Sequence, residues 1–198
     1  MSKTTEKQEG GRIGNTIKYY RNGVQCERSM PASVSNPKTE KQQLVRSKFG
    51  LTSKLASNIL HLLIHPYWNP IAEKDDRTGY NLFVSFNNPA FRNGILSAER
   101  LRLCPGNGLN QENYSVEKNE NRIQIRWDSS ISTHRKNDKD QLYLIVLKKD
   151  LKCKFIDTNI IRENDYCEYG FSNEDEKSLF AFWRNEGKWS ESKLVYSE

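Results

Sequence analysis

Hydrophobic and polar residues alternate over short runs near the N-terminus, recur at helical spacing in the middle of the chain, and alternate again in the C-terminal half. Two β-prone runs, residues 16–20 and 24–28, flank the dipeptide Asn22-Gly23. Because both central residues of a tight hairpin turn need positive φ angles, this pattern predicts a β-hairpin over residues 13–29. A two-stranded hairpin is marginally stable alone, so it must pack on the rest of this chain or on another subunit.

The middle of the chain has the spacing of an amphipathic helix. From Glu40 onward, apolar residues recur at steps of three and four, which predicts one helix of about 25 residues that ends at Pro66. Pro70 fits the first turn of a second, short helix. Residues 79–88, which Thr78 can cap, suit either a helix or a strand, and we expect a helix. The apolar positions of the long helix are Leu44, Val45, Phe49, Thr52, Leu55, Ala56, Ile59, Leu62 and Leu63.

The C-terminal half contains seven short β-prone runs, separated by clusters of Asn, Asp, Gly and Glu. Ile123, Ile125 and Trp127 alternate with polar residues, so we expect them on one face of a strand. Seven short strands at this spacing predict an immunoglobulin- or fibronectin-like β-sandwich. The cysteine positions lack the antibody pattern, which favours the fibronectin-like topology.

The sequence therefore predicts an α+β fold, in which an N-terminal β-hairpin and helices precede a fibronectin/immunoglobulin-like β-sandwich. Residues 1–10 are predicted to form a disordered tail, residues 11–92 a basic β-hairpin plus helical arm, and residues 95–198 the sandwich. Hydrophobic residues make up 35% of the 198, which indicates a thin core. Aromatic residues at 11% argue against a disordered chain.

Charge is distributed unevenly along the chain. Residues 1–50 hold ten Lys or Arg against four Glu, a net charge of +6, whereas the remainder is neutral. This asymmetry favours contact with a polyanion or an acidic protein face, but it also fits a solvated surface, since no run of five or six basic residues occurs. The candidate contact residues are Tyr19, Tyr20, Arg21, Arg28, Lys38, Arg46 and Lys48.

Motifs for catalysis or metal binding are sparse. His61 and His65 lie four residues apart, and a metal site would need a third ligand such as Asp75 or Asp76, so a packed or exposed histidine pair is the better interpretation. The four cysteines form no C-x-x-C pair and fit small hydrophobic residues in a reducing cytoplasm. No apolar run approaches the length of a membrane span. We expect no metal, cofactor, membrane contact or small-molecule substrate.

Several N-terminal segments also carry a family resemblance. The segments that carry the resemblance are Gly11-Arg-Ile-Gly-Asn15, Asn22-Gly23, Arg28-Ser-Met-Pro31, Asn36-Pro-Lys-Thr39 and Arg46-Ser-Lys-Phe49. Together they resemble an uncharacterised family, a domain of unknown function common in Bacteroidota. Thr78-Gly-Tyr-Asn-Leu-Phe83 is similar to a segment of small phage-encoded proteins. The resemblance implies no activity; it favours a structural or binding role in a phage-derived or other mobile-element assembly, in the cytoplasm or in a virion-like particle.

Three functional hypotheses follow. The leading one is a non-enzymatic binding or assembly module that contacts a protein partner, or a second copy, through the basic N-terminal residues. The alternative is a nucleic-acid-binding protein that uses the same residues, with an affinity that falls steeply with salt. An enzyme with a site near His61, His65, Asp75 and Asp76 is the least favoured.

Overall fold

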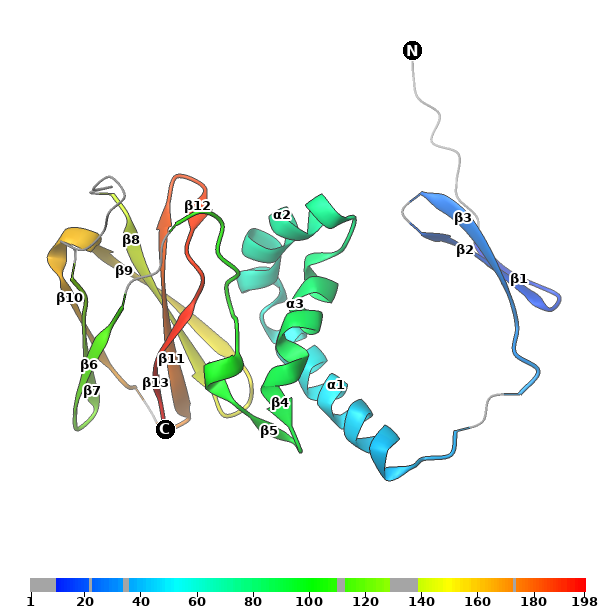
Figure 1. Ribbon diagram of the computed structural model, residues 1–198, viewed down its shortest axis with the longest axis horizontal. Helices are drawn as coiled ribbons and strands as arrows, with labels where there is room; N and C mark the ends of the chain where they lie inside the picture. Colours follow the sequence, from blue (N-terminus) through cyan, green and yellow to red (C-terminus); the bar gives the residue numbers. More distant parts are fainter. Residues whose placement is uncertain (1–9, 22, 34–35, 110–112, 129–138, 173) are drawn as a thin grey trace, which may run out of the picture. The chain divides into compact units, whose positions relative to one another are not determined.

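The computed structural model describes residues 10–21, 23–33, 36–109, 113–128, 139–172 and 174–198 (Figure 1). The chain divides into two compact units, residues 1–40 and residues 41–198, and we call the second unit the body. The disordered tail predicted over residues 1–10 lies, except for Gly10, outside the described residues.

The first unit contains three antiparallel strands, which we call the N-terminal sheet: β1 (Gly11–Ile13), β2 (Thr16–Arg21) and β3 (Val24–Ser29). The hairpin that the sequence predicts is formed by β2 and β3, with Arg21 opposite Val24. Asn22, the first residue of the predicted turn, lies outside the described residues. The sequence analysis missed β1. This strand pairs with β2 because Gly14, at φ 57°, reverses the chain in a conformation that glycine adopts without strain.

The body begins with α1 (Glu40–Asn58), which is followed by a π-helix, η1 (Leu60–Trp68). The prediction that the helix ends at Pro66 is wrong, because η1 continues past it. In a π-helix the N–H groups reach back five residues, as Ile64 does to the carbonyl of Ile59 at 3.2 Å. The wider turn relieves the clash that a proline ring makes with the carbonyl four residues back in an α-helix.

Short helices complete this part of the body. Pro70 lies in the first turn of α2, as predicted, and Thr78 caps α3 by accepting a hydrogen bond from the N–H of Asn81 at 3.2 Å. The segment that suited a helix or a strand is therefore helical. The elements are α2 (Asn69–Ala72), η2 (Glu73–Asp75), α3 (Gly79–Asn87), η3 (Asn88–Ala90), the strand pair β4 (Phe91–Arg92) and β5 (Ile95–Leu96), and η4 (Ala98–Arg100).

Two antiparallel sheets follow, and all seven predicted strand regions are present in them. One sheet has the order β10-β7-β6; the other has the order β12-β11-β8-β9, with β13 also paired to β11. Their bounds are β6 (Ser115–Asn119), β7 (Arg122–Arg126), β8 (Gln141–Lys148), β9 (Cys153–Ile161), β10 (Tyr166–Gly170), β11 (Glu176–Asn185), β12 (Lys188–Trp189) and β13 (Lys193–Ser197), with η6 (Arg162–Asn164) between β9 and β10.

The five-stranded sheet is the middle layer of the body, between the helices and the three-stranded sheet (Figure 1). Tyr143 and Ile145 of β8 belong to a core shared with the helices. Leu142 and Leu144, on the opposite face of the same strand, belong to a second core that includes Ile123 of β7. The protein is therefore a mixed α+β fold, with both faces of one sheet buried.

The division between units differs from the division that the sequence suggested. The boundary between the two compact units follows residue 40 in the sequence, whereas the sequence analysis separated a helical arm from the sandwich at residues 92–95. The helices belong with the sheets because they share one core. Tyr67 of η1, for example, packs its ring edge-to-face on Phe182 of β11 and on Trp189 of β12, each at 5.3 Å.

Candidate functional site

The strand register sorts the side chains of the N-terminal sheet onto two faces, because residues directly opposite in antiparallel strands share a face. Tyr19 lies opposite Cys26, Ile17 opposite both Arg28 and Arg12, and Lys18 opposite Glu27. We call one side the arginine face: Arg12, Ile17, Tyr19, Val24, Cys26 and Arg28. We call the other the lysine face: Ile13, Thr16, Lys18, Tyr20, Gln25, Glu27 and Ser29.

The two faces differ in charge. On the lysine face, Lys18 Nζ lies 2.9 Å from Glu27 Oε1, so this pair is neutral. Glu27 is the only carboxylate among the described residues of the N-terminal sheet. The described side chains of the arginine face therefore include two guanidinium groups and no carboxylate. Arg12 Nε donates to the carbonyl of Gly14 at 3.1 Å, and Arg28 is exposed. The arginine face thus combines cationic ends with Tyr19 and aliphatic side chains.

Burial separates this sheet from an ordinary protein sheet. No described residue of the N-terminal sheet is buried, and Val24 is 64% exposed. A sheet that covers neither face within its own unit gains little from the hydrophobic effect. Its exposed tyrosine, arginines and aliphatic residues are types found at protein interfaces.

The residues proposed from the sequence do not form one cluster. Tyr19 and Arg28 share the arginine face, but Tyr20 lies on the lysine face, so the adjacent tyrosines cannot contact the same flat surface. Arg21 pairs with Val24 in the register, and its side chain lies outside the described set. Lys38, at φ 51°, is in the segment between β3 and α1. Arg46 and Lys48 lie on α1, in the body.

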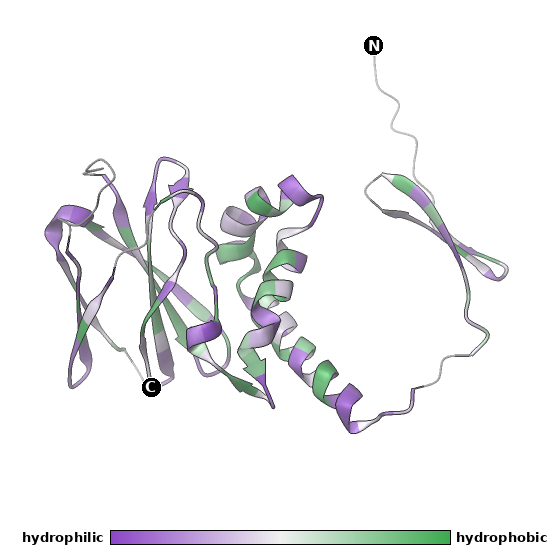
Figure 2. Ribbon diagram, in the orientation of Figure 1, coloured by the Kyte–Doolittle hydropathy of each residue, from purple (hydrophilic) through white to green (hydrophobic). Residues whose placement is uncertain are grey.

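The sequence analysis missed a second exposed surface, on the first half of α1. Leu44, Val45 and Phe49 are 54%, 66% and 54% exposed, whereas Leu55 and Ala56 are fully buried. Leu44 and Leu55 are eleven residues apart, as are Val45 and Ala56, which is close to three helical turns. The same face of α1 is therefore buried in its second half and bare in its first, and hydrophobic positions recur along the whole helix (Figure 2). We call Leu44, Val45 and Phe49 the bare stripe.

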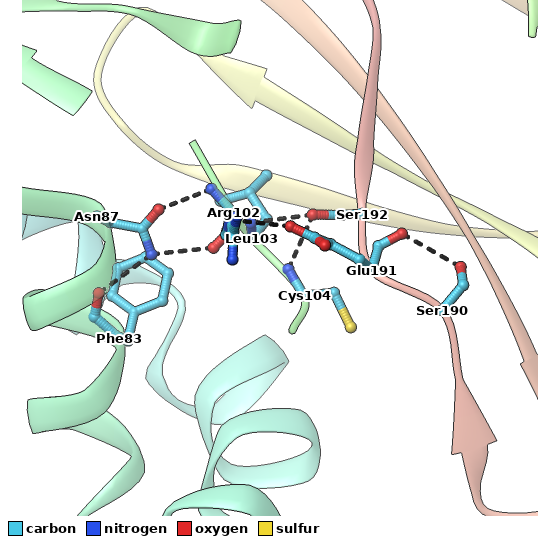
Figure 3. Close-up of polar contacts among 8 residues, drawn as sticks. All are labelled: Phe83, Asn87, Arg102, Leu103, Cys104, Ser190, Glu191 and Ser192. Atoms are coloured by element: carbon cyan, nitrogen blue, oxygen red, sulfur yellow. Dashed lines mark hydrogen bonds and ion pairs between the residues drawn. The ribbon is translucent and has the colours of Figure 1, made fainter. Parts of the chain in front are cut away.

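An open groove of about 960 Å³ lies where α3 meets the loop before β13, with Phe86 and Leu194 among its lining residues. Figure 3 shows the polar contacts of three of its lining residues, Arg102, Glu191 and Ser192. Asn87 donates to the carbonyl of Arg102 at 2.9 Å and accepts from its N–H at 2.7 Å. Ser192 Oγ accepts from the N–H groups of Leu103 and Cys104, both at 3.0 Å.

These bonds attach the segment 102–104 to α3 on one side and to the loop before β13 on the other. Arg102 Nε also lies 2.9 Å from Glu191 Oε1, across the same region (Figure 3). Every polar side chain in this group is thus committed to a structural bond.

A smaller cavity of about 220 Å³ lies beside Phe171 and Tyr196 and is lined by several carboxylates, including Glu176. Glu176 accepts hydrogen bonds from Tyr169 Oη at 2.8 Å, and from both the N–H and the hydroxyl of Ser172 at 3.1 Å. Burial by itself raises the pKa of the Glu176 carboxyl, but the three hydrogen bonds outweigh it and the pKa is lowered. A carboxylate that is ionised and fully bonded acts here as a structural acceptor.

Histidine, cysteine and acidic residues form no metal-binding group in the described part of the chain. His61 and His65 are exposed on η1 with ring centroids 4.8 Å apart, while Asp75 and Asp76 end the short helices that follow. No group of three or more His, Cys, Asp or Glu residues suited to a metal ion occurs among the described residues. The histidine pair is therefore a ring contact on the surface.

The cysteine thiols of the body are not activated. Burial, with a smaller contribution from Asp150, raises the pKa of Cys153 to about 12, and burial with Glu168 raises that of Cys167 to about 11. Burial also raises the pKa of Cys104. Because the thiolate is the nucleophile, these groups are inert near neutral pH. Cys153 and Cys167 lie on strands of different sheets.

Comparison with known proteins identifies one family. A family model described as "Family of unknown function (DUF6266)" matches residues 6–160, a range that runs from before β1 almost to the end of β9. No curated protein and no solved structure matches the chain. Among the described residues, no helix combines the length and apolar character that a membrane crossing requires.

Proposed function

Because the chain belongs to this family of unknown function, whose match covers most of its length, we propose a function from the surfaces that it exposes. We propose that the protein is a non-enzymatic assembly module, which associates with protein through its N-terminal sheet and the first half of α1. A second copy of the chain is the partner tested first. The body acts as the rigid support that carries these two surfaces.

One observation carries this proposal: the exposed apolar side chains are concentrated near the N-terminus. Adjacent exposed apolar side chains mark an interaction site more than scattered single residues do, and the bare stripe is such a group on one helix. Ten large hydrophobic residues are exposed in the described chain, and six of them lie within the first fifty residues. Those six are Ile13, Tyr19, Val24, Leu44, Val45 and Phe49.

The fibronectin-like topology, the relation to phage-encoded proteins and the location predicted from the sequence are part of the same proposal. We infer that the two sheets of the body form a fibronectin-like sandwich. The inference is supported by a core shared between a sheet ordered β6-β7-β10 and a sheet ordered β9-β8-β11-β13. The relation to phage-encoded or Bacteroidota proteins, and a place in the cytoplasm or in a virion-like assembly, remain expectations from the sequence resemblance.

Light scattering of the full chain tests the association. We expect a defined oligomer at both low and high salt, because burial of apolar side chains is insensitive to screening. Val24→Ser and Val45→Ser should each shift the mass toward the monomer. Ile161→Ser is the matched control, since Ile161 is also an exposed aliphatic residue but lies on β9 of the body. A monomer at every concentration, or equal effects of all three substitutions, contradicts the proposal.

A nucleic-acid-binding protein is the second candidate, and the arginine face favours it. Tyr19 can stack on a base while Arg12 and Arg28 meet phosphates, with no carboxylate on the same face. Addition of a single-stranded or duplex oligonucleotide at low salt provides the test. Binding that weakens steeply with salt and is reduced by Arg28→Gln, in a chain that is otherwise a monomer, replaces the assembly proposal with this one.

A further inference from the structure

The outer edge of β3 has backbone groups that face away from the N-terminal sheet. The register of β2 and β3 continues to Met30, whose N–H donates to the carbonyl of Asn15 at 2.7 Å. Alternate residues of a strand bond to the same neighbour, so Val24, Cys26 and Arg28 direct their backbone groups to β2. Gln25, Glu27 and Ser29 therefore direct theirs outward. No strand of the described chain pairs with this edge.

This edge lacks most of the features that protect exposed strands. Proteins block such edges with charged side chains, lysine above all, and with proline, bulges or very short strands. β3 has two charged residues, Glu27 and Arg28. β3 has six residues, none of which is proline or lysine, and its register with β2 is regular. β1, at the opposite edge, has only three residues and offers little length for pairing. An additional strand is therefore accommodated at β3.

We propose that β3 pairs antiparallel with β3 of a second copy, about a two-fold axis at Cys26, and so joins two N-terminal sheets into one of six strands. This proposal rests on the assembly function and names its partner and its contact. The two-fold axis is perpendicular to the sheet, because only that symmetry relates one strand edge to its own copy in an antiparallel ladder. Such an axis passes midway between one residue and the same residue of the second copy, and we name the axis by that residue.

Charge and strand length together select the register. An axis at Gln25 would pair only residues 24–26 of β3. An axis at Glu27 places two carboxylates opposite each other, and an axis at Arg28 does the same with two guanidinium groups. An axis at Cys26 places Gln25 opposite Glu27 and Val24 opposite Arg28, so like charges do not meet. It also joins the outward backbone groups of Gln25 to those of Glu27. The arginine faces then lie on the same side, with their aliphatic residues adjacent.

Cys26 reports directly on this arrangement. Its backbone bonds to β2, so the two Cys26 residues face each other at a position without hydrogen bonds between the copies, where Cα atoms are about 4.5 Å apart. That separation permits a disulfide. Diamide accepts the two electrons and two protons released by the thiols. We expect rapid formation of a covalent dimer by the full chain and none by Cys26→Ser.

The register has its own test. In a Cys26→Ser background, Glu27→Cys alone should crosslink poorly, since residue 27 lies opposite residue 25. A mixture of Gln25→Cys and Glu27→Cys chains, both in that background, should give the covalent dimer. Equal crosslinking at position 27 alone means that the axis is elsewhere, and absence of any crosslink, Cys26 included, overturns the pairing.

Noncovalent assembly is tested by blocking the edge. Glu27→Pro removes an outward N–H and leaves the bonds to β2, whereas Glu27→Gln removes the charge and keeps the N–H. We expect Glu27→Pro to weaken dimerisation at least about tenfold and Glu27→Gln to leave it nearly unchanged. Circular dichroism confirms that both variants fold.

The outcomes separate this proposal from the assembly function on which it rests. An oligomer that persists in Glu27→Pro but is lost in Val45→Ser keeps the assembly function and overturns the strand pairing. A chain that stays monomeric and binds an oligonucleotide overturns both. Loss of the dimer in Glu27→Pro, together with Cys26 crosslinking in the unmodified chain, supports both.

Discussion

The sheet in the middle of the body and the N-terminal sheet are both antiparallel, yet their side chains have opposite environments. Every residue of β8 from Leu142 to Leu147 is buried, because helices cover one face of the strand and β7 and β10 cover the other. In the N-terminal sheet no described residue is buried. A run of consecutive apolar residues marks a strand with two covered faces, whereas charged residues on both faces leave a strand available for contact.

The largest effect on the free energy of unfolding should come from an aromatic ring of the five-stranded sheet, whose two faces are both buried. The ring centroid of Phe182 lies within 6 Å of the ring centroids of Tyr67, Tyr143 and Phe155, and the Phe182 side chain is fully buried. Phe182→Ala should therefore lower the free energy of unfolding by about 3–5 kcal/mol, through lost burial and the cavity left behind. Urea denaturation measures this. Val24→Ala, in the N-terminal sheet, should change the unfolding of the body by less than about 0.5 kcal/mol; equal losses would contradict the contrast.

The next comparison is between two ion pairs, one in the body and one in the N-terminal sheet. In the body, Arg162 Nη2 lies 3.1 Å from Asp140 Oδ2 and both side chains are nearly buried, while Asn185 donates to the same carboxylate at 2.9 Å. Asp140→Ala leaves the guanidinium buried without this partner and should cost about 3 kcal/mol.

The matched pair is Lys18 and Glu27, whose side chains are exposed. Glu27→Ala should cost less than about 1 kcal/mol, because water screens the attraction and the long side chains lose entropy when they pair. Thermal unfolding of both variants at two salt concentrations checks the difference. A salt-sensitive loss at Asp140, or a large loss at Glu27, would be inconsistent with the burial of each pair.

Local signals in the sequence predicted much of the fold. Alternation placed Ile123 and Ile125 on one buried face, and Thr78 capped the helix that follows it. The errors have a common origin in nonlocal contacts. Continuation of the helix past Pro66 depends on the packing of Tyr67 against the five-stranded sheet and of Trp68 against α3, and no local pattern gives the position of those elements.

Part of the geometry of the N-terminal sheet follows from the sequence. The period of two in a strand already separates Tyr19 from Tyr20, and the register then adds Arg12 to the face of Tyr19. The bare stripe could not be found from the sequence, because the apolar spacing of α1 is the same in its exposed and buried halves. Leu55 is buried and Leu44 is exposed because the rest of the body packs against the second half of α1 and not against the first.

A smaller effect is expected from Glu176, and it depends on pH. Glu176→Gln should lower the free energy of unfolding near pH 7 by about 1.5–3 kcal/mol, because hydrogen bonds to a charged acceptor are replaced by weaker ones. Since the pKa of Glu176 is lowered in the folded chain from its ordinary 4.5, its contribution is present above pH 4.5 and is lost as pH falls through the lowered pKa.

Urea titrations from pH 7 to pH 3 therefore should show the unmodified chain and Glu176→Gln converging on the acid side. Tyr169→Phe removes one of the three donors and should give a smaller loss with the same pH dependence. A gap between the two proteins that stays constant below pH 4 would exclude the ionised carboxylate as its source.

The smallest effects come from two neighbours on α1, and they separate stability from association. Gly50 is helical, has open space around it and lies away from the bare stripe, so Gly50→Ala should raise the free energy of unfolding by about 0.5–1 kcal/mol. Phe49, one residue earlier, is half exposed and belongs to the bare stripe. Phe49→Ala should change stability by less than about 0.5 kcal/mol but weaken the oligomer measured by light scattering. If Phe49→Ala destabilises the isolated chain instead, the stripe is covered within the chain and the first half of α1 resembles the buried strands more than the N-terminal sheet.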